Sequence, residues 1–542
     1  MFGKDQFMGS AAATGFVRET TSTDPYRYQY GFGNHHATEA IPGALPQNGT
    51  NLPAKTRFGL YPEHLNGTSF ISSRETVSNV WMFRERPGAP HGSLRQVRTH
   101  HQMQASFLPT NPKVDFTPLP HTWGPLPSPK ADSTPSVTAG RTTFVQGLKT
   151  IGGNGDATLR EGLAVHQYAF DADMHRQAFV NHDGDLLLIP QQGELDIKTE
   201  MGCLRVPPGM ISVMPAGIRF SVSIVPSQTD LAPSHAAGYA LEVYGTRFRL
   251  PELGVLGANG LAHVRDFEYP VAAFDLDPTP PPGVAPWEVT IKLAGRLFSY
   301  TQPNTPFDVV AWHGCHAPYR YDLSRFHHLS ANRDQLDPTA YCVLTAPSKY
   351  PTVSAVDFCI FGEKWAVNQD TMRVPYFHRT MATELCGVIH GEYKGSVRPL
   401  EPGGLSFEAS YMPHGESYEA YALDREQSLS PRPVAKVATG FLSFMIHVPS
   451  HFGLTKWATQ DHPDIRPERP GLWDSFRGHM LDHLDDVNAC LSRAGMITLQ
   501  PHEPPTPPDS PSGGAGAVQL VEVDELAGAG EVAGRKERLN PI

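Results

Sequence analysis

Three residues in the C-terminal half of the chain have the types and spacing of metal ligands. His378 and Glu384 stand six positions apart in YFHRTMATE (376–384), and His414 follows thirty positions later in YMPHGE. Two histidines and one carboxylate form the facial triad that holds Fe(II) and leaves coordination positions open. The residues therefore predict an open metal site. A structural zinc site is disfavoured, because no cysteine cluster accompanies them.

No straight element can bring His378 and Glu384 to one ion. Six residues span about 20 Å on a strand, at roughly 3.3 Å each. On a helix they are about 9 Å apart along the axis and point roughly 120° away from each other. We therefore expect the chain to bend within RTMAT (379–383), as neighbouring strands of a small β-barrel would allow. A chance pairing stays open at this point, because the chain has 25 histidines.

Short strand-like runs fill most of the chain between scattered prolines (51) and glycines (49). Residues 185–224 show the pattern, with apolar or alternating stretches that end at PQQG, EMG, PPG and PAG. This punctuation is typical of an all-β protein with few helices. Helical periodicity is clearest at 477–495, where apolar residues recur at spacings of four, three and four.

Composition excludes several classes of function. No basic stretch offsets the net charge of −11, so nucleic acid is not an expected partner. Six cysteines without a CxxC pair favour reduced thiols and a cytoplasmic protein. We expect no membrane span, because no run of about 18 apolar residues occurs.

Several ordered blocks of the chain match one known family. They are YGFGN (30–34), FGLYPEHLNGTSF (58–70), DGDLLLIPQQGEL (183–195), LEVYGTRFRLPELGVLGANGLA (241–262), FDVVAWHG (307–314), RVPYFHRTMATELCGVIHGEY (373–393), MPHG (412–415) and GLTKW (453–457). On these blocks the chain resembles the homogentisate 1,2-dioxygenase family from about residue 28 to about residue 460. These iron-dependent enzymes open the ring of homogentisate to maleylacetoacetate in tyrosine and phenylalanine breakdown.

The resemblance implies a fold, a cofactor and an assembly. It implies a large N-terminal β domain, a smaller C-terminal cupin-like barrel that carries Fe(2+), and a homo-oligomer built from trimers or hexamers. The iron ligands map onto His378, Glu384 and His414. Tyr393, Tyr376 and His414 map onto residues that contact the dihydroxyphenyl acid, which reacts with dioxygen at the open iron site.

Composition and resemblance together divide the chain into five parts. The proline-rich run DLDPTPPPGVAPWE (275–288) is interpreted as the connection between the two β domains. The expected parts are a flexible N-terminus (1–27), an N-terminal β domain (28–285), a C-terminal iron-binding domain (286–475), a helical segment (476–500) and a disordered tail (501–542).

Two positions depart from the family pattern. The family's presumed base is a histidine where this chain has Gln335, and glutamine has no titratable proton acceptor. A further family histidine near the ligands is replaced by Glu408, which is either the candidate proton acceptor or a carboxylate that only hydrogen-bonds a ligand histidine. A loop shift that brings His327 or His328 into the vacated place is the less favoured explanation. The departures leave two alternatives open, namely a paralogue acting on another dihydroxyphenyl acid, or a cupin-like protein without this activity.

Overall fold

The computed structural model describes most of the chain in sixteen ranges. They are 17–18, 24–47, 53–69, 73–97, 103–129, 141–226, 235–252, 262–276, 283–328, 341–350, 353–365, 376–391, 400–425, 436–437, 440–468 and 470–500. The expected tail (501–542), Gln335 and Tyr393 lie outside these ranges.

The protein is built mainly of β-strands with few helices, as the sequence predicts. The largest sheet has eleven strands, and all of them except β30 come from the first 322 residues. In sheet order they are β1 (Val17–Arg18), β2 (Tyr28–Tyr30), β18 (Phe267–Pro270), β22 (Tyr319–Asp322), β15 (Met210–Met214), β12 (Gly184–Gln192), β17 (Ala236–Tyr244), β10 (Glu161–Phe170), β9 (Leu148–Asp156), β30 (Gly453–Thr455) and β7 (Val114–Asp115).

Two further sheets complete the N-terminal part. The seven-stranded sheet contains β14 (Gly202–Val206), β13 (Leu195–Thr199), β16 (Arg219–Ile224), β11 (Gln177–Asn181), β19 (Trp287–Leu293), β20 (Arg296–Gln302) and β6 (Arg95–Gln96). The four-stranded sheet contains β3 (His36–Glu39), β21 (Val309–Gly314), β5 (Asn79–Arg84) and β4 (Tyr61–Asn66).

A second seven-stranded sheet carries the candidate site. Its order is β23 (Cys342–Pro347), β24 (Ser354–Phe361), β29 (Leu442–Val448), β26 (Thr383–His390), β27 (Leu405–Glu408), β8 (His121–Trp123) and β31 (Ile465–Arg466). A small sheet pairs β25 (Lys364–Trp365) with β28 (Lys436–Val437). Because β8 comes from the N-terminal part and β30 from the C-terminal part, each part contributes a strand to the other's sheet.

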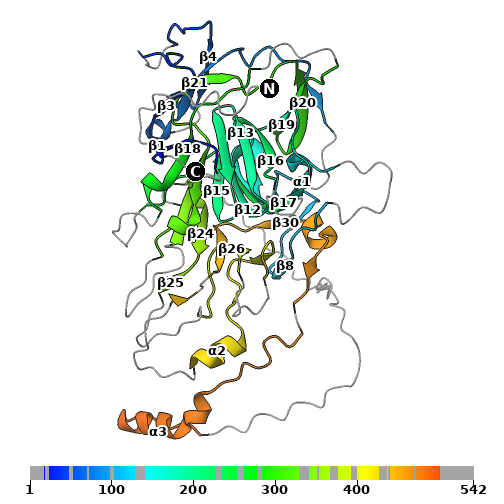
Figure 1. Ribbon diagram of the computed structural model, residues 1–542. Coiled ribbons are helices and arrows are strands. Elements are labelled where there is room, and N and C mark those ends of the chain that lie inside the picture. The colour runs from blue at the N-terminus through cyan, green and yellow to red at the C-terminus, as the bar shows by residue number, and fades with distance from the viewer. Residues whose placement is uncertain are drawn as a thin grey trace, which may run out of the picture. The chain divides into compact units, whose positions relative to one another are not determined.

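The eleven-stranded sheet and the sheet that carries the candidate site share one hydrophobic core. Strand β12 lies against β26 (Figure 1), and buried side chains of both sheets belong to the same cluster. The fully buried Tyr239 of β17 ties them together, since its hydroxyl donates to the carbonyls of Val388 (3.1 Å) and Gly404 (2.7 Å). These bonds hold β26 and the approach to β27 at a fixed position on the larger sheet.

The strands after the proline-rich run do not begin a new domain. Strand β19 pairs in parallel with β11, β21 pairs with β3 and β5, and β22 pairs with β15 and β18. All of these partners belong to the N-terminal sheets. We therefore propose that the boundary lies near residue 323 rather than at residue 285.

Helices are short in the described chain. They comprise the α-helices α1 (Phe144–Gly147), α2 (Tyr418–Arg425) and α3 (Leu484–Arg493), the 3₁₀ turns η1 (Arg74–Thr76), η2 (Ala157–Leu159), η4 (Val264–Asp266), η5 (Leu323–Arg325) and η8 (Met480–His483), and the π-helical turn η7 (Trp457–Asp461). The helix α3 forms where periodicity predicts one, in a separate compact unit that begins at Phe476. None of the described helices is long and apolar enough to cross a membrane.

Candidate metal centre

The chain bends between His378 and Glu384 as their spacing requires. His378 lies in an isolated two-residue bridge with His414, in which each backbone N–H donates to the other's carbonyl at 3.0 Å. Residues 381–382 then turn the chain, and Glu384 is the second residue of β26. The bridge places the two histidines side by side, and the turn brings the carboxylate to them.

Both histidines present the same nitrogen to the carboxylate. The Nδ1 atom of His378 lies 2.9 Å from the carbonyl oxygen of Tyr376, and Nδ1 of His414 lies 3.0 Å from that of Met412. A carbonyl oxygen only accepts, so Nδ1 carries the proton in both rings. The lone pair of Nε2 is then available to a metal ion, which is the usual way a backbone carbonyl fixes a ligand histidine.

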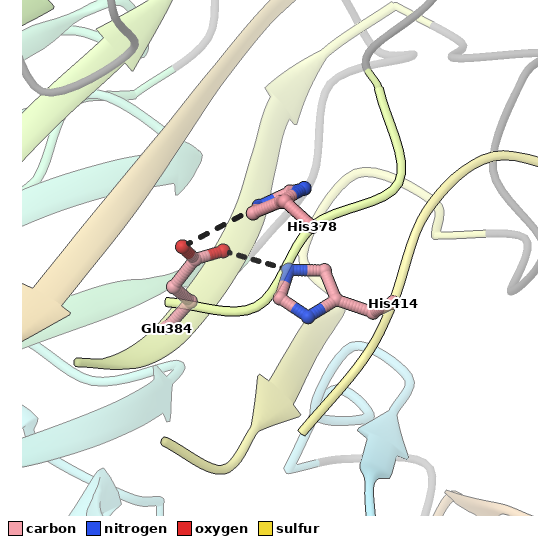
Figure 2. A group of neighbouring side chains, drawn as sticks. All are labelled: His378, Glu384 and His414. Atoms are coloured by element: carbon pink, nitrogen blue, oxygen red, sulfur yellow. Dashed lines mark hydrogen bonds and ion pairs between the residues drawn. The ribbon is translucent and has the colours of Figure 1, made fainter. Parts of the chain in front are cut away.

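The three side chains converge on one point (Figure 2). Oε2 of Glu384 lies 3.3 Å from Nε2 of His414, and Oε1 lies 3.9 Å from Nε2 of His378. One ligand atom from each residue fits within 4.8 Å of the others. An ion about 2 Å from each donor needs donors about 3 Å apart, so the 3.3 Å pair is nearly in place and the wider distances would have to close by about 1–2 Å around a single ion.

The electrostatics of the group favour a cation. Burial alone raises the pKa of Glu384, but in the metal-free protein His378 and His414, when also protonated at Nε2, donate hydrogen bonds to it that outweigh burial and lower that pKa to about 2. The hydrogen bond with Glu384 in turn raises the pKa of His378. Glu384 is therefore an anion at neutral pH. Its side chain is 11% exposed while that of His378 is 29% exposed, so the site is buried at Glu384 and has an open side at His378.

Comparison with known proteins settles the family. The model "Homogentisate 1,2-dioxygenase N-terminal" matches residues 27–323, and "Homogentisate 1,2-dioxygenase C-terminal" matches residues 324–480. The chain belongs to the homogentisate 1,2-dioxygenase family. Its two family segments meet at the position where the N-terminal sheets end.

Relatives that carry the family name cover most of the chain. The homogentisate 1,2-dioxygenase of Caenorhabditis elegans is 40% identical over 81% of this chain and 95% of its own length. Those of Arabidopsis thaliana (38%, 84% and 93%) and Dictyostelium discoideum (39%, 81% and 95%) are similar to the same degree. Among solved structures, a cupin 2 conserved barrel domain protein from Leptotrichia buccalis aligns over 53% of this chain and 83% of that chain, with 9% identity and a TM-score of 0.22.

The other residues predicted from the family divide between described and undescribed parts. Tyr376 lies at the site, with its ring centroid 5.4 Å from that of His378 and 47% of the residue exposed. Glu408 is directly opposite Glu384 in the β26–β27 ladder. Gln335 and Tyr393 lie outside the described residues, so their roles stay predictions.

The histidines considered as substitutes for Gln335 lie in the stretch after β22. His327 is exposed. Nε2 of His328 lies 3.1 Å from the backbone nitrogen of Gly362, and the ring packs against Tyr341 at a centroid distance of 5.4 Å. His328 is thus held by Gly362 and Tyr341. Burial lowers the pKa of its imidazole.

Sequence spacing did not point to His447 of β29, which is directly opposite Glu384 on the side away from Glu408. Its signal in the sequence is weak. In LSFMIHV (442–448) the alternation of apolar and polar residues places His447 on the face that β29 turns away from the core. Only the pairing of the strands shows which residue it faces.

Proposed function

We propose that this chain is an Fe(II)-dependent dioxygenase that opens the ring of homogentisate to maleylacetoacetate. One observation carries the proposal: two histidine nitrogens and one carboxylate converge within 4.8 Å in a chain of the homogentisate 1,2-dioxygenase family. Nitrogen and oxygen donors in this number are those of non-haem iron oxygenases. Ferrous iron held by them would supply open coordination positions and the redox chemistry that dioxygen requires.

The chain's own residues would hold and orient the reactants. His378, Glu384 and His414 fix the ion against the sheet. Exposed apolar side chains lie within three positions of a ligand along the chain, namely Tyr376, Phe377, Met381 and Tyr411, which are between 45% and 76% exposed. They offer an aromatic acid a surface beside the open side of the site.

Glu408 is the proposed proton acceptor for the substrate phenol. It lies opposite Glu384 in an antiparallel ladder, so both side chains leave the same face of the sheet. The side chain of Gln335 cannot take a proton in this pH range. A carboxylate beside a cationic site can accept one from a phenol whose acidity the site increases.

A second candidate keeps the chemistry and changes the substrate. Gln335 and Glu408 replace two histidines of the family while the three ligands are retained. This combination favours a paralogue that cleaves another dihydroxyphenyl acid.

Oxygen uptake by the iron-loaded protein separates these candidates. Uptake with homogentisate at a rate well above that with other dihydroxyphenyl acids supports the first proposal. Uptake only with another acid of the panel supports the paralogue. Iron that is bound at one equivalent without any uptake would refute both and leave a metal-binding protein.

We also propose a homo-oligomer, trimeric or hexameric, that resides in the cytoplasm. The family resemblance and the exposed apolar side chains beside the site support the assembly. The six cysteines are all free, which favours a reducing compartment. Sedimentation of the purified protein tests the assembly.

A further inference from the structure

A row of polar side chains crosses the sheet that carries the metal ligands. Residues directly opposite one another on five neighbouring strands are Thr345 of β23, Asp357 of β24, His447 of β29, Glu384 of β26 and Glu408 of β27. Directly paired residues leave the same face of a sheet. Glu384 therefore has His447 on one side and Glu408 on the other.

The register of this row is fixed by the core. The next residue along each of the four strands β24, β29, β26 and β27, one position before or after the row, is buried on the opposite face. These residues are Phe358, Ile446, Leu385 and Phe407. A slip of one residue in any strand would turn this apolar face to the polar side, so the position of His447 beside Glu384 is strongly specified.

His447 has an unused hydrogen-bonding atom in this row. Its Nδ1 is buried and has no partner among the described residues. The side of the row beyond His447 is already tied together, because the hydroxyl of Thr345 donates to Oδ1 of Asp357 at 2.6 Å. Burial raises the pKa of Asp357, and the hydrogen bond from Thr345 acts against it. His447 is thus directly opposite Asp357 on one side and Glu384 on the other.

The two neighbours of Glu384 differ in what they can do for it. Glu408 is an acceptor next to an acceptor, and like charges directly opposite each other on a sheet are destabilising. His447 is a ring with an N–H donor, and a donor beside a ligand carboxylate fixes its orientation. The unpaired, buried Nδ1 of His447 also costs free energy. A closer contact of this ring with its neighbours in the metal-bound protein would recover that free energy.

We propose that His447 is a positioning residue for the metal centre, which holds the Glu384 carboxylate between His378 and His414. The carboxylate must turn one oxygen to each histidine, at 3.9 Å and 3.3 Å, although its own side chain has several rotatable bonds. In this proposal the ring of His447, directly opposite on the adjacent strand, limits those rotations. His447 does not contact the substrate in this proposal.

The inference rests on the proposed function only in taking Glu384 as a metal ligand. Its test therefore measures metal binding rather than turnover. If the wild-type protein binds no metal, the proposed function fails. If the wild type binds metal and the variants of His447 bind equally well, this inference alone fails.

The experiment titrates metal-free protein with Co(II) and follows the visible absorption of the bound ion. His447→Ala is expected to weaken Co(II) affinity about 10- to 100-fold, the usual effect of removing a group that orients a ligand. His447→Asn, which keeps one N–H donor, is expected to fall between the alanine variant and the wild type. His390→Ala is the matched control, because His390 is an exposed histidine at the end of the same strand as Glu384.

A rescue experiment separates positioning from general damage to the fold. Position 408 flanks Glu384 as 447 does, so Glu408→His offers a ring from the other side. The double variant His447→Ala with Glu408→His is expected to bind Co(II) at least about tenfold more tightly than His447→Ala alone. Unchanged Co(II) affinity and absorption in His447→Ala would overturn the inference, as would a loss that Glu408→His does not reduce. If His447→Ala does not fold, as judged by circular dichroism, His447→Asn with and without Glu408→His decides by the same criteria.

Discussion

Replacement of His414 by alanine is the most direct test of the metal centre. It removes the Nε2 atom that lies 3.3 Å from the Glu384 carboxylate. The backbone bridge to His378 survives, since the alanine keeps the N–H and carbonyl that form it. Within the described residues the only group of three potential ligands is this one, so no other side chain there completes the set. The variant should therefore fold normally and bind metal weakly.

The size of the effect follows from binding linkage. At a free metal concentration of 100 times Kd, binding stabilises the folded protein by about 2.7 kcal/mol. Loss of a direct ligand should weaken metal affinity at least about 100-fold. This is the upper end of the effect of removing a group that only orients a ligand. The same metal concentration then equals Kd, and the stabilisation falls to about 0.4 kcal/mol. At roughly 2 °C per kcal/mol, the metal-dependent rise in Tm should shrink by about 5 °C.

The assay compares Tm with and without metal, and the metal retained after gel filtration. Fe(II) is used under anaerobic conditions, and Co(II) as a stable substitute. His390→Ala, an exposed histidine on β26, should retain the full wild-type rise. Full metal loading and an unchanged rise in His414→Ala would refute the assignment of the triad.

Four further predictions test other parts of the argument. Glu408→Gln should keep its iron and lose about 10²- to 10⁴-fold in oxygen uptake, and a wild-type rate with iron intact would exclude Glu408 as the base. Ending the chain at Leu499 should leave Tm and sedimentation unchanged, because the tail's proline- and glycine-rich composition cannot bury enough apolar surface to fold; a clear drop in either would show that the tail packs on the body. Lys292→Met should cost about 3–5 kcal/mol in urea unfolding, because it leaves Asp183 and Glu242 buried without their cation. Burial raises the pKa of Glu242, but Lys292 and His166 outweigh it and lower that pKa to about 2. The ionised Glu242 therefore stabilises the folded protein fully above pH 4.5, and this contribution is lost as the pH falls towards 2. Glu242→Gln should flatten the dependence of unfolding free energy on pH in this range.

The convergence of His378, Glu384 and His414 could be predicted from the sequence because metal chemistry restricts the choice of residues. The histidine–carboxylate–histidine set is one of few that leave a metal open, and neither a strand nor a helix satisfies the spacing of His378 and Glu384. That conflict predicts the turn found at residues 381–382. The alternation of short apolar runs likewise predicts the β-rich fold, since period-two burial is a local property.

The organisation of the sheets was not predictable in the same way. The proline-rich run 275–288 looks like a linker, yet β19, which begins at residue 287, and β20, which follows it, pair within the N-terminal sheets. Strand pairing joins residues more than a hundred positions apart, as in the pairing of β11 with β19. Composition carries no information about such partners, so a connection between strands of one sheet resembles a connection between domains.

The surroundings of Glu384 show the same limit at the scale of a single side chain. Its cross-strand neighbours Glu408 and His447 are 24 and 63 positions away in sequence, and neither spacing indicates a contact. Position 408 attracts notice through the family resemblance, because a histidine is expected there. The structure shows that a histidine does lie beside Glu384, on the opposite strand. The absence of a ring at 408 therefore does not mean that Glu384 lacks one, and variants at 408 and 447 have to be interpreted as a pair whose effects on metal binding are not additive.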